Sequence, residues 1–525
     1  MKNTFKPIVL VILDGWGLSD KQKGNAIANA KLPTIDKLNH FYPHIALQAS
    51  GISVGIPWGE PGNSEVGHLT LGTGQTLYQN LPRITMSIQN GEFFKNTAFL
   101  GAIEHAKKNN SAVHIMGLLG KGGIHSSTDH LYGLLELLRD QKFDRVYLHI
   151  FTDGRDCAQT SGAECVAELQ KRIANYSIGQ IATISGRYYG MDRNNNWDRV
   201  KLAYDAMTEG TGNQIEDPIE YLKKSYKKEV FDEYLEPAVI IENGKPIAKI
   251  SDNDALIFFN FREDRAREIT KAFILPGFNK FEKKPLKNLH FVAMVQYEAD
   301  LPVSAIAFPV VEVDTCLGGV LAKNKLTQLR IAETEKFAHV TYFFNGGNEE
   351  PFPLEDRVII PSKDVPRFDE APEMSAKEIT QKVCEFIQKE QYDFILINYA
   401  NADIIGHTGN EAAAISAVET IDKCLAELVR EVLLKNGCLL ITADHGNVEE
   451  MVSIRTGEKN TEHSTNPVPL WFITSENHQE NSTTSSFEVS GLLSDIAPTI
   501  LALFAIKKPD EMSGESLLSL LVNKK

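Results

Sequence analysis

The chain has 525 residues, with 54 Lys and Arg against 69 Asp and Glu, which gives a formal charge of −15. A single core seldom grows past about 250–300 residues, so two or more domains are expected. The apolar fraction of 42% and the charged fraction of 23% are typical of a soluble globular protein and exclude disorder, collagen and coiled coil as the main architecture. The acidic balance argues against non-specific binding to nucleic acid or anionic membranes.

The N-terminal region and the cysteines bear on the compartment. Ile8–Leu13 is a run of six apolar residues stopped by Asp14, which is too short for the apolar part of a secretory signal. No stretch of the sequence reaches the roughly 18 apolar residues of a membrane helix. The six cysteines include no CxxC pair, so we expect reduced thiols rather than a disulfide framework. The sequence therefore predicts a cytoplasmic protein that does not bind membranes.

Six short apolar runs, each followed by polar or glycine-rich residues, are predicted to be strands buried on both faces. In chain order they are Ile8–Leu13, Val146–Phe151, Ile181–Ile184, Leu256–Phe259, Phe394–Ile397 and Cys438–Thr442. Helical patterns such as Ala412–Leu434 separate them, which predicts an α/β fold with mainly parallel sheets. Ligands of such sheets bind beyond the carboxyl ends of the strands, and the polar clusters of this chain follow those ends.

Arginine is unevenly distributed along the chain. Eleven of the sixteen arginines lie between Arg83 and Arg267, whereas the main Asp and His clusters lie outside that stretch. The simplest interpretation is a discontinuous metal-bearing domain, residues 1–78 with 313–525, interrupted by an arginine-rich insertion of residues 79–312. The overall acidity would then coexist with a local excess of positive charge in the insertion.

Carboxylates and imidazoles cluster after the predicted strands of the outer domain. They are Asp14, the pair Asp403 and His407, the pair Asp444 and His445, and His463. A spacing of four residues directs Asp403 and His407 the same way on a helix. Oxygen and imidazole ligands suit Mn²⁺ or Zn²⁺, and the lack of cysteine argues against a structural zinc site. Taken singly, an Asp-Gly after a strand is typical of a turn and an i, i+4 Asp–His pair is typical of an exposed ion pair.

Ser64 lies in a Gly- and Pro-rich turn, GEPGNSEVGH at 59–68, that leads into an apolar segment. At such a turn, backbone N–H groups at the start of a helix could hold an anion. The chain has no Gly-x-Ser-x-Gly elbow, so a hydrolase triad is not indicated. A bound divalent metal would activate the hydroxyl as a nucleophile, and with Ser64 the seven candidate ligands suffice for two ions. The alternative role is an N-cap serine.

Several motifs, in the same order from Leu13 to Pro469, together resemble those of the cofactor-independent (2,3-bisphosphoglycerate-independent) phosphoglycerate mutases. They are LDGWG at 13–17, GNSEVGH at 62–68, GGIHS at 122–126, TDGRD at 152–156, SGRYYGMDR at 185–193, NFREDR at 260–265, ETEKFAHVTYFFNGG at 333–347, EDRVIIPS at 355–362, GHTG at 406–409, TADHGN at 442–447 and HSTNPVP at 463–469. The resemblance covers nearly the whole chain.

The resemblance implies a doubly wound, alkaline-phosphatase-like α/β domain with an inserted second α/β domain, and a monomer that binds two Mn²⁺ ions. It implies that Asp403, His407 and His463 bind one ion, and that Asp14, Ser64, Asp444 and His445 bind the other. Substrate contacts would fall on His125, Arg155, Asp156, Arg187, Arg193, Arg262, Arg265 and Lys336. The implied reaction interconverts 3-phosphoglycerate and 2-phosphoglycerate in glycolysis and gluconeogenesis, without bisphosphoglycerate. Lys121, Ser127 and Ile404 depart from the family pattern. None of them is an implied ligand, so the departures concern details of the pocket rim and not the reaction.

The hypothesis that follows is a two-step phosphoryl transfer through a phosphoserine on Ser64. Arg262 and Arg265 would clamp the substrate anion, and Asp156 would take and return the hydroxyl proton while Arg155 helps to hold the glycerate. Lys336 would neutralise phosphate as a point charge, and closure of the insertion would exclude water. Two alternatives stay open. The first is a metal-dependent phosphomonoesterase or phosphopentomutase on the same core, and the second is a catalytically silent metal- or anion-binding protein.

Overall fold

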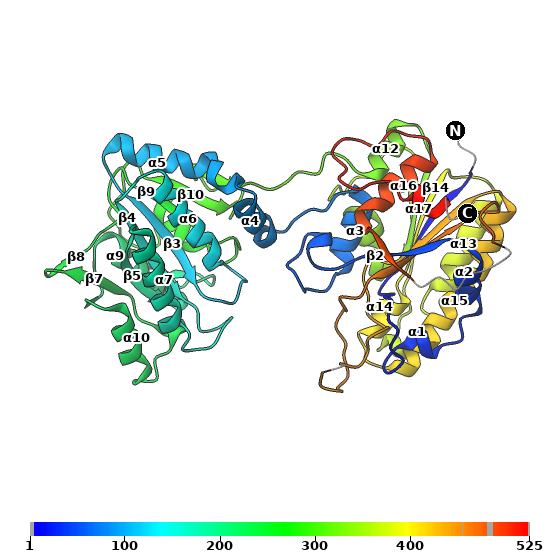
Figure 1. Cartoon of the computed structure of the whole chain (residues 1–525), viewed down its shortest axis with the longest axis horizontal. Helices are drawn as coiled ribbons and strands as arrows, with labels where there is room; N and C mark the ends of the chain where they lie inside the picture. The colour runs from blue at the N-terminus through cyan, green and yellow to red at the C-terminus, as the bar shows by residue number, and fades with distance from the viewer. Residues whose placement is uncertain (1–4, 454, 480–486, 523–525) are drawn as a thin grey trace. The chain divides into compact units, whose positions relative to one another are not determined.

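The computed structural model describes residues 5–453, 455–479 and 487–522. Contacts within the chain divide it into two compact units (Figure 1). Unit 1 consists of Met1–Gln79 and Glu312–Lys525, and unit 2 is the intervening segment Asn80–Val311. These bounds lie one residue from those expected, and the roles assigned to the two parts stay predictions.

Unit 1 is built on an eight-stranded sheet. The first five strands in its order run parallel, and β16 pairs antiparallel with both of its neighbours. Every residue of β1, β14 and β15 is buried, in keeping with the apolar runs Ile8–Leu13, Phe394–Ile397 and Cys438–Ile441. The order is β13 (Glu355–Ile360), β12 (Gln328–Glu333), β14 (Phe394–Tyr399), β1 (Ile8–Leu13), β15 (Cys438–Thr442), β16 (Val468–Ile473), β2 (His44–Gln48) and β17 (Val489–Leu492).

Helices cover both faces of this sheet (Figure 1). On one side lie α2 (Pro33–Phe41), α13 (Ala376–Gln388) and α15 (Glu411–Leu434), which pack on one another. On the other lie α3 (Ser64–Thr73), α12 (Leu317–Lys323) and α16 (Ile496–Leu503). Three short helices complete the unit, namely α1 (Ala26–Asn29), α14 (Asn401–Gly406) and α17 (Leu518–Val522).

Unit 2 has its own sheet and its own apolar core. Its strand order is β11 (Ala305–Phe308), β10 (His290–Val295), β9 (Ala255–Phe258), β3 (Val113–Leu119), β4 (Val146–Thr152), β5 (Gln180–Gly186), β7 (Ala238–Glu242) and β6 (Asn213–Ile215), with β8 (Lys245–Pro246) paired to β7. The first six run parallel. Its helices are α4 (Asn80–Gln89), α5 (Thr97–Asn109), α6 (Thr128–Asp140), α7 (Gly162–Tyr176), α8 (Arg187–Gly190), α9 (Trp197–Thr208), α10 (Pro218–Tyr226) and α11 (Arg267–Ile274).

The predicted fold class is confirmed, since both units are α/β and each sheet is mainly parallel. Each of the six predicted strands is a strand of the structure, and the helix expected over 412–434 is α15. Within the described residues, no helix is both long enough and apolar enough to cross a membrane.

Candidate active site

Four neighbouring parallel strands of unit 1 carry polar side chains just beyond their carboxyl ends. Asp14 follows β1, Asp403 lies on α14 after β14, Asp444 follows β15, and Lys336 lies in the turn after β12. Because these strands are adjacent, the four side chains meet at one edge of the sheet. All four are at least 97% buried.

Ser64 is the first residue of α3 and lies at this edge. The N-cap is Asn63, whose side-chain oxygen accepts the N–H of Val66 at 2.9 Å, so the capping role expected as the alternative for Ser64 belongs to its neighbour. The Ser64 hydroxyl lies 3.1 Å from Asp14 Oδ1 and 3.0 Å from His445 Nε2. Asp14 therefore accepts the hydrogen bond of the hydroxyl, and an imidazole nitrogen faces the same oxygen.

The ammonium of Lys336 makes three short contacts in the same place. Its Nζ donates to Ser64 Oγ at 2.6 Å, to Asp14 Oδ1 at 2.7 Å and to Asp403 Oδ2 at 2.7 Å. Burial alone would lower the pKa of Lys336, but the charges of Asp14 and Asp403 raise it well above its usual range. The side chain is therefore a fixed positive charge beside Ser64.

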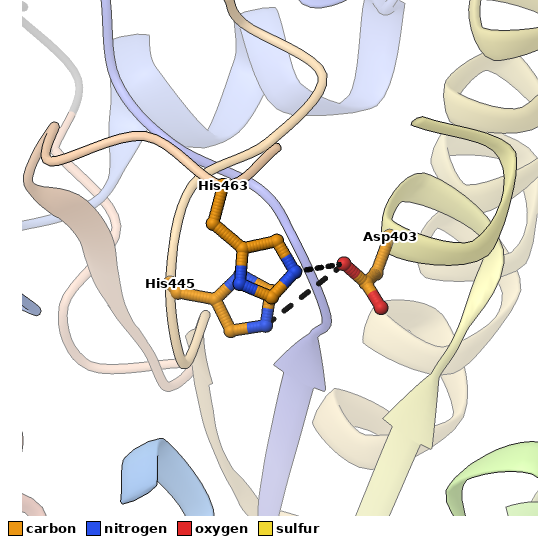
Figure 2. A group of neighbouring side chains, drawn as sticks. All are labelled: Asp403, His445 and His463. Atoms are coloured by element: carbon orange, nitrogen blue, oxygen red, sulfur yellow. Dashed lines mark ion pairs between the residues drawn. The ribbon is translucent and has the colours of Figure 1, made fainter. Parts of the chain in front are cut away.

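Asp403 Oδ1 lies where three imidazoles converge. His463 Nε2 is 3.1 Å from it, His407 Nε2 is 3.2 Å and His445 Nε2 is 4.0 Å. Figure 2 shows the imidazoles of His445 and His463 together on one side of the carboxylate, and their ring centroids are 3.8 Å apart. His407 and Asp403 thus point the same way, as their spacing predicted, and His445 joins them from a separate loop.

The tautomers of His407 and His463 bear on whether this group fits a cation. His407 Nδ1 faces the carbonyl of Thr461 at 2.7 Å, and His463 Nδ1 faces the carbonyl of Gly62 at 2.8 Å. A carbonyl only accepts, so in each neutral ring the proton sits on Nδ1 and the lone pair on Nε2. The two Nε2 atoms are 3.0 Å apart and both face Asp403. Two lone pairs and a carboxylate oxygen at one point suit a metal ion, so these residues fit one.

The second group of candidate ligands surrounds Ser64. His445 Nε2 lies 3.5 Å from Asp14 Oδ1 and 3.5 Å from Asp444 Oδ2. Although burial lowers it, the charges of Asp444, Asp403 and Asp14 raise the pKa of His445 to about 9. Carboxylates gathered this closely carry excess negative charge that a cation would neutralise, so this group also fits a metal ion.

Two side chains of this region, His68 and Asn398, had no place in the sequence-based site. His68 Nδ1 lies 2.8 Å from the carbonyl of Ser64 and 3.1 Å from Asp444 Oδ2. Asn398 Nδ2 donates to Asp14 Oδ2 at 2.8 Å and lies 3.0 Å from His68 Nε2. Asp14, His68 and Asp444 place their ligand atoms within 4.8 Å of one another. His68 lies in the GNSEVGH motif, which was the one feature of the sequence that could have drawn attention to it. Sequence reasoning nevertheless gave His68 no role.

Unit 2 repeats the arrangement with arginines at the ends of parallel strands. Asp153, just after β4, accepts the N–H groups of Arg155 at 3.2 Å and Asp156 at 3.1 Å and so shapes the TDGRD loop. Arg187, after β5, donates from NH1 to Asp153 at 2.6 Å and to Asp156 at 2.5 Å. Burial alone would raise the pKa of Asp156, but the hydrogen bond and charge of Arg187 lower it, so Asp156 is an ionised carboxylate.

His125 lies between two carboxylates. Its Nε2 is 3.7 Å from Asp156 and its Nδ1 is 3.6 Å from Asp264. Burial and the charge of Arg187 lower the pKa of His125 to about 4, so the ring is neutral. Asp264 also holds two arginines, with Arg193 NH1 at 2.7 Å and Arg262 Nε at 3.3 Å. Asp264 lies inside the NFREDR block, and sequence reasoning gave it no role.

The arginines of this region differ in their exposure and in their hydrogen-bond partners. Arg155 and Arg262 are about half exposed, and Arg155 lies 3.5 Å from Glu233. Arg265 NH1 donates to the carbonyl of Met191 at 3.1 Å. Arg187, in contrast, is 2% exposed. The structure thus brings together two groups of ion pairs, Arg187 with Asp156, and Arg193 and Arg262 with Asp264, on either side of the neutral ring of His125. Arg155 and Arg265 lie on the loops beside them.

The three departures from the family pattern also have a place. Lys121 pairs with Glu164 at 3.0 Å and Glu168 at 3.3 Å, both on α7. Ser127 is the N-cap of α6, where its hydroxyl accepts the N–H of Asp129. Ile404 is half-buried on α14 and packs against the core of unit 1. Each side chain therefore has a local structural partner.

Comparison with known proteins was informative over nearly the whole length. Residues 84–299 match the family model described as the BPG-independent PGAM N-terminus. The 2,3-bisphosphoglycerate-independent phosphoglycerate mutase of Clostridium botulinum (strain Langeland) is 48% identical over 98% of this chain and 99% of its own. That of Acetivibrio thermocellus is 49% identical over the same shares. A solved structure of Leishmania mexicana phosphoglycerate mutase at low cobalt concentration is 28% identical, with a TM-score of 0.51 and 97% of each chain covered.

The similarity to these relatives extends over both α/β units. Identity near one half over 98% of the chain leaves no room for a shared module on an otherwise different protein. The chain therefore belongs to the family of 2,3-bisphosphoglycerate-independent phosphoglycerate mutases, which are isomerases.

Proposed function

We propose that the chain interconverts 3-phosphoglycerate and 2-phosphoglycerate, without bisphosphoglycerate, through a phosphoserine on Ser64 and with two Mn²⁺ ions. The observation that carries the proposal is the environment of one oxygen. Ser64 Oγ has a lysine ammonium at 2.6 Å, an imidazole nitrogen at 3.0 Å and a carboxylate oxygen at 3.1 Å. A serine held in this way is a nucleophile rather than a surface hydroxyl.

The metal sites follow from the donor sets. Asp403, His407 and His463 would hold one ion, and Asp14, Ser64, Asp444 and His445 would hold the other. Bound there, divalent ions supply Lewis acidity to a phosphoryl oxygen and to the serine oxygen. Carboxylate oxygens with imidazole nitrogens are ligands that Mn²⁺ accepts, and thiolates are absent from both sets.

Ser64 attacks the phosphorus of the substrate, the bond to the substrate oxygen breaks, and the phosphoryl group moves to Oγ. Lys336 stabilises the charge on Oγ as the hydroxyl proton leaves. The other hydroxyl of the glycerate then attacks the phosphoserine and restores Ser64. In the first step, the proton released by Ser64 passes to the departing substrate oxygen. In the second step, the ionised Asp156 accepts the proton of the attacking hydroxyl and returns it to Ser64 as the bond between phosphorus and Oγ breaks.

Unit 2 supplies the groups that keep hold of an anion. Arg155, Arg193 and Arg262 are about half exposed, so their guanidinium groups are available to a carboxylate or a phosphate. Arg187 holds Asp156 in place instead of offering a free fork. Retention of glycerate by these arginines separates a mutase from a phosphatase, in which water takes the phosphoryl group.

One assay tests the proposal and separates it from its alternatives. The protein is incubated with 3-phosphoglycerate and Mn²⁺ in the absence of bisphosphoglycerate, and the appearance of 2-phosphoglycerate is followed. We expect rapid conversion, its loss in excess chelator, and an acid-stable phosphate on the tryptic peptide that contains Ser64. Inorganic phosphate as the main product would favour the phosphomonoesterase. Conversion of 3-phosphoglycerate without phosphate on the peptide that contains Ser64 would contradict the phosphoserine intermediate.

We propose further that the enzyme acts as a monomer in the cytoplasm. Both side-chain clusters are built from one chain, which supports a monomer. Light scattering during size-exclusion chromatography at micromolar concentration should give the mass of one 58.4 kDa chain.

A further inference from the structure

We propose that Glu449 is the positioning residue of the candidate metal centre, which it sets by binding the three loops that carry its ligands. The inference rests on the proposed metal sites. Glu449 lies outside the family motifs, and it is 1% exposed. A carboxylate buried to this extent must be met by donors, and the identity of those donors is what assigns its role.

Four donors reach the Glu449 carboxylate. Oε2 accepts the backbone N–H of Gly17 at 3.1 Å and that of Asn447 at 2.8 Å. Oε1 accepts the Asn466 side-chain amide at 3.0 Å and the Ser464 hydroxyl. These donors come from loops 14–17, 444–447 and 463–466. Each of the three loops begins with a candidate ligand.

Two glycines of the motifs show how closely the carboxylate is packed. A Cβ at Gly17 would lie 2.3 Å from Glu449 Cδ, and a Cβ at Gly446 would lie 2.4 Å from Glu449 Oε1. A side chain at either position would expel the carboxylate. The absence of a side chain at Gly17 and Gly446 is therefore explained by the space that Glu449 occupies, and no contact with a substrate is needed to explain it.

The fourth ligand-bearing element is tied in through Asn447. Its backbone N–H binds Glu449, and its side-chain Nδ2 donates to Asp403 Oδ1 at 3.1 Å. The loops also bind one another, since Ser464 N–H donates to the Gly446 carbonyl at 3.0 Å and Val448 N–H donates to that of Gly15 at 3.3 Å. Glu449 thus joins the loops that carry Asp14, Asp444 and His463 directly, and it joins the segment that carries Asp403 through Asn447.

This arrangement requires an acceptor on both oxygens. Two backbone N–H groups converge on Oε2, and neither can reverse its direction. Glutamine keeps the shape but replaces one acceptor by an amide that donates. The hydrogen bonds then survive only if the Ser464 hydroxyl turns and the Asn466 amide flips, and that flip gives up the Asn466 contact with Glu450. The ligand loops would then hold their side chains less accurately, and residues of this kind commonly change metal affinity by about 10- to 100-fold.

The test measures metal binding directly. Chelator-treated wild type, Glu449→Gln and Glu450→Gln are titrated with Mn²⁺ by calorimetry, and the Mn²⁺ concentration for half-maximal turnover is measured in parallel. Glu450 is the matched control, because it is adjacent and its Oε2 lies 3.4 Å from the same Asn466 amide. We expect Glu449→Gln to weaken Mn²⁺ binding at least about 10-fold, with kcat at saturating Mn²⁺ within about 3-fold of wild type. Glu450→Gln should bind as wild type does.

Asn466→Ala serves as a second variant, since it removes one donor from Oε1 and leaves the buried carboxylate in place. We expect a loss of several-fold in Mn²⁺ affinity, and this variant decides the matter if Glu449→Gln does not fold. Wild-type affinity in every folded variant would overturn the inference and leave the metal sites standing. A wild type that binds no Mn²⁺ would overturn the metal sites and the inference together.

Discussion

Residues of the same type have different roles in this molecule, and their burial and neighbouring charges determine which role each one has. Arg187 is buried between Asp153 and Asp156, whereas Arg262 is about half exposed and touches one carboxylate. Removal of a buried cation leaves carboxylates uncompensated, but removal of an exposed one leaves them to water. Ser64 differs from other serines in the same way, because its hydroxyl faces a lysine, a histidine and an aspartate.

The first prediction concerns the nucleophile. Ser64→Ala removes the oxygen that receives the phosphoryl group, so turnover of 3-phosphoglycerate should fall by at least roughly a thousandfold. Circular dichroism should be unchanged, because Asn63 and not Ser64 caps α3. Ser53→Ala is the control, since Ser53 donates to the Ser50 carbonyl away from the ligands. Activity within tenfold of wild type would contradict the assignment.

The second prediction compares two arginines. Arg262→Ala should lower kcat/KM by about 10- to 100-fold through lost charge-assisted hydrogen bonds, and should change stability by less than about 1 kcal/mol. Arg187→Ala should destabilise the protein by about 3–5 kcal/mol in urea unfolding. Arg139→Ala, which removes an exposed arginine paired with Glu136 and Asp140, should change neither quantity appreciably. The reverse order of the two stability losses would contradict the roles given to their surroundings.

At the scale of elements, α3 is held against the end of β15 by a glycine. A Cβ at Gly67 would lie 2.7 Å from Asp444 Cβ and 2.8 Å from the Asp444 carbonyl. The helix that carries Ser64 therefore approaches a candidate ligand backbone to backbone. Strand β12 has a different feature at its end, where Glu333 is fully buried three residues before Lys336. Both residues lie in family motifs, and neither has been given a chemical role in the proposed reaction.

The third prediction uses that close approach. Alanine in the middle of a helix normally stabilises it by about 1 kcal/mol relative to glycine. Gly67→Ala should do the opposite, because α3 must move away from Asp444, and turnover should fall with stability. Gly101→Ala in α5 is the matched control, since a Cβ there meets no atom within 4 Å. Thermal unfolding should rise for Gly101→Ala and fall for Gly67→Ala, and equal stabilisation would refute the packing argument.

The fourth prediction concerns pH. Burial raises the pKa of Glu333 to about 7 from 4.5, so the folded protein keeps a proton that the unfolded chain releases. The stabilisation is complete below the unfolded pKa and is lost as the pH rises through the folded one. Between about pH 6 and 8.5, wild type should lose roughly 1.5 kcal/mol that Glu333→Gln keeps. Urea unfolding at both pH values measures this difference, and the exposed neighbour variant Glu335→Gln should follow wild type.

Local patterns were sufficient for most elements, but not for the supporting side chains of the site. An unbroken apolar run such as Ile8–Leu13 can bury all of its side chains only in a sheet that is covered on both faces. The strands, and the polar residues that follow them, were therefore predictable. The three carboxylates Asp14, Asp403 and Asp444 were found because each lies just beyond such an end. His68, Asn398 and Asp264 were missed because their roles depend on partners far away in sequence, as in the pairing of Asn398 with Asp14. A polar side chain that is buried against a distant segment leaves no recognisable pattern in the sequence around it.

At the scale of the whole molecule, the two units should respond differently to metal. The candidate metal ligands all lie in unit 1, and the candidate substrate-binding arginines lie in unit 2. A ligand that binds only the folded state stabilises it by about 2.7 kcal/mol at a concentration one hundred times its Kd.

The fifth prediction tests this difference by hydrogen exchange with mass spectrometry. Mn²⁺ should slow exchange in peptides that cover β1, β14 and β15, and chelator should reverse the effect. Peptides that cover β3 and β4 of unit 2 should exchange at unchanged rates. His463→Ala should lack the protection in unit 1. Equal protection of both sheets, or none in unit 1, would contradict the placement of the ions.

The pairing of β1 has a consequence for biosynthesis. Ile8 pairs with Phe394 on one side and with Cys438 on the other. Strand β1 therefore cannot pair until β14 and β15 have been synthesised, almost 400 residues later. At about 5–20 residues per second the delay is tens of seconds. Unit 2 is contiguous, and every strand of its sheet has left the ribosome before β14 is made. A nascent chain therefore carries the apolar segment Ile8–Leu13 without its strand partners while the inserted domain is already complete, and we expect chaperones to bind that segment during translation.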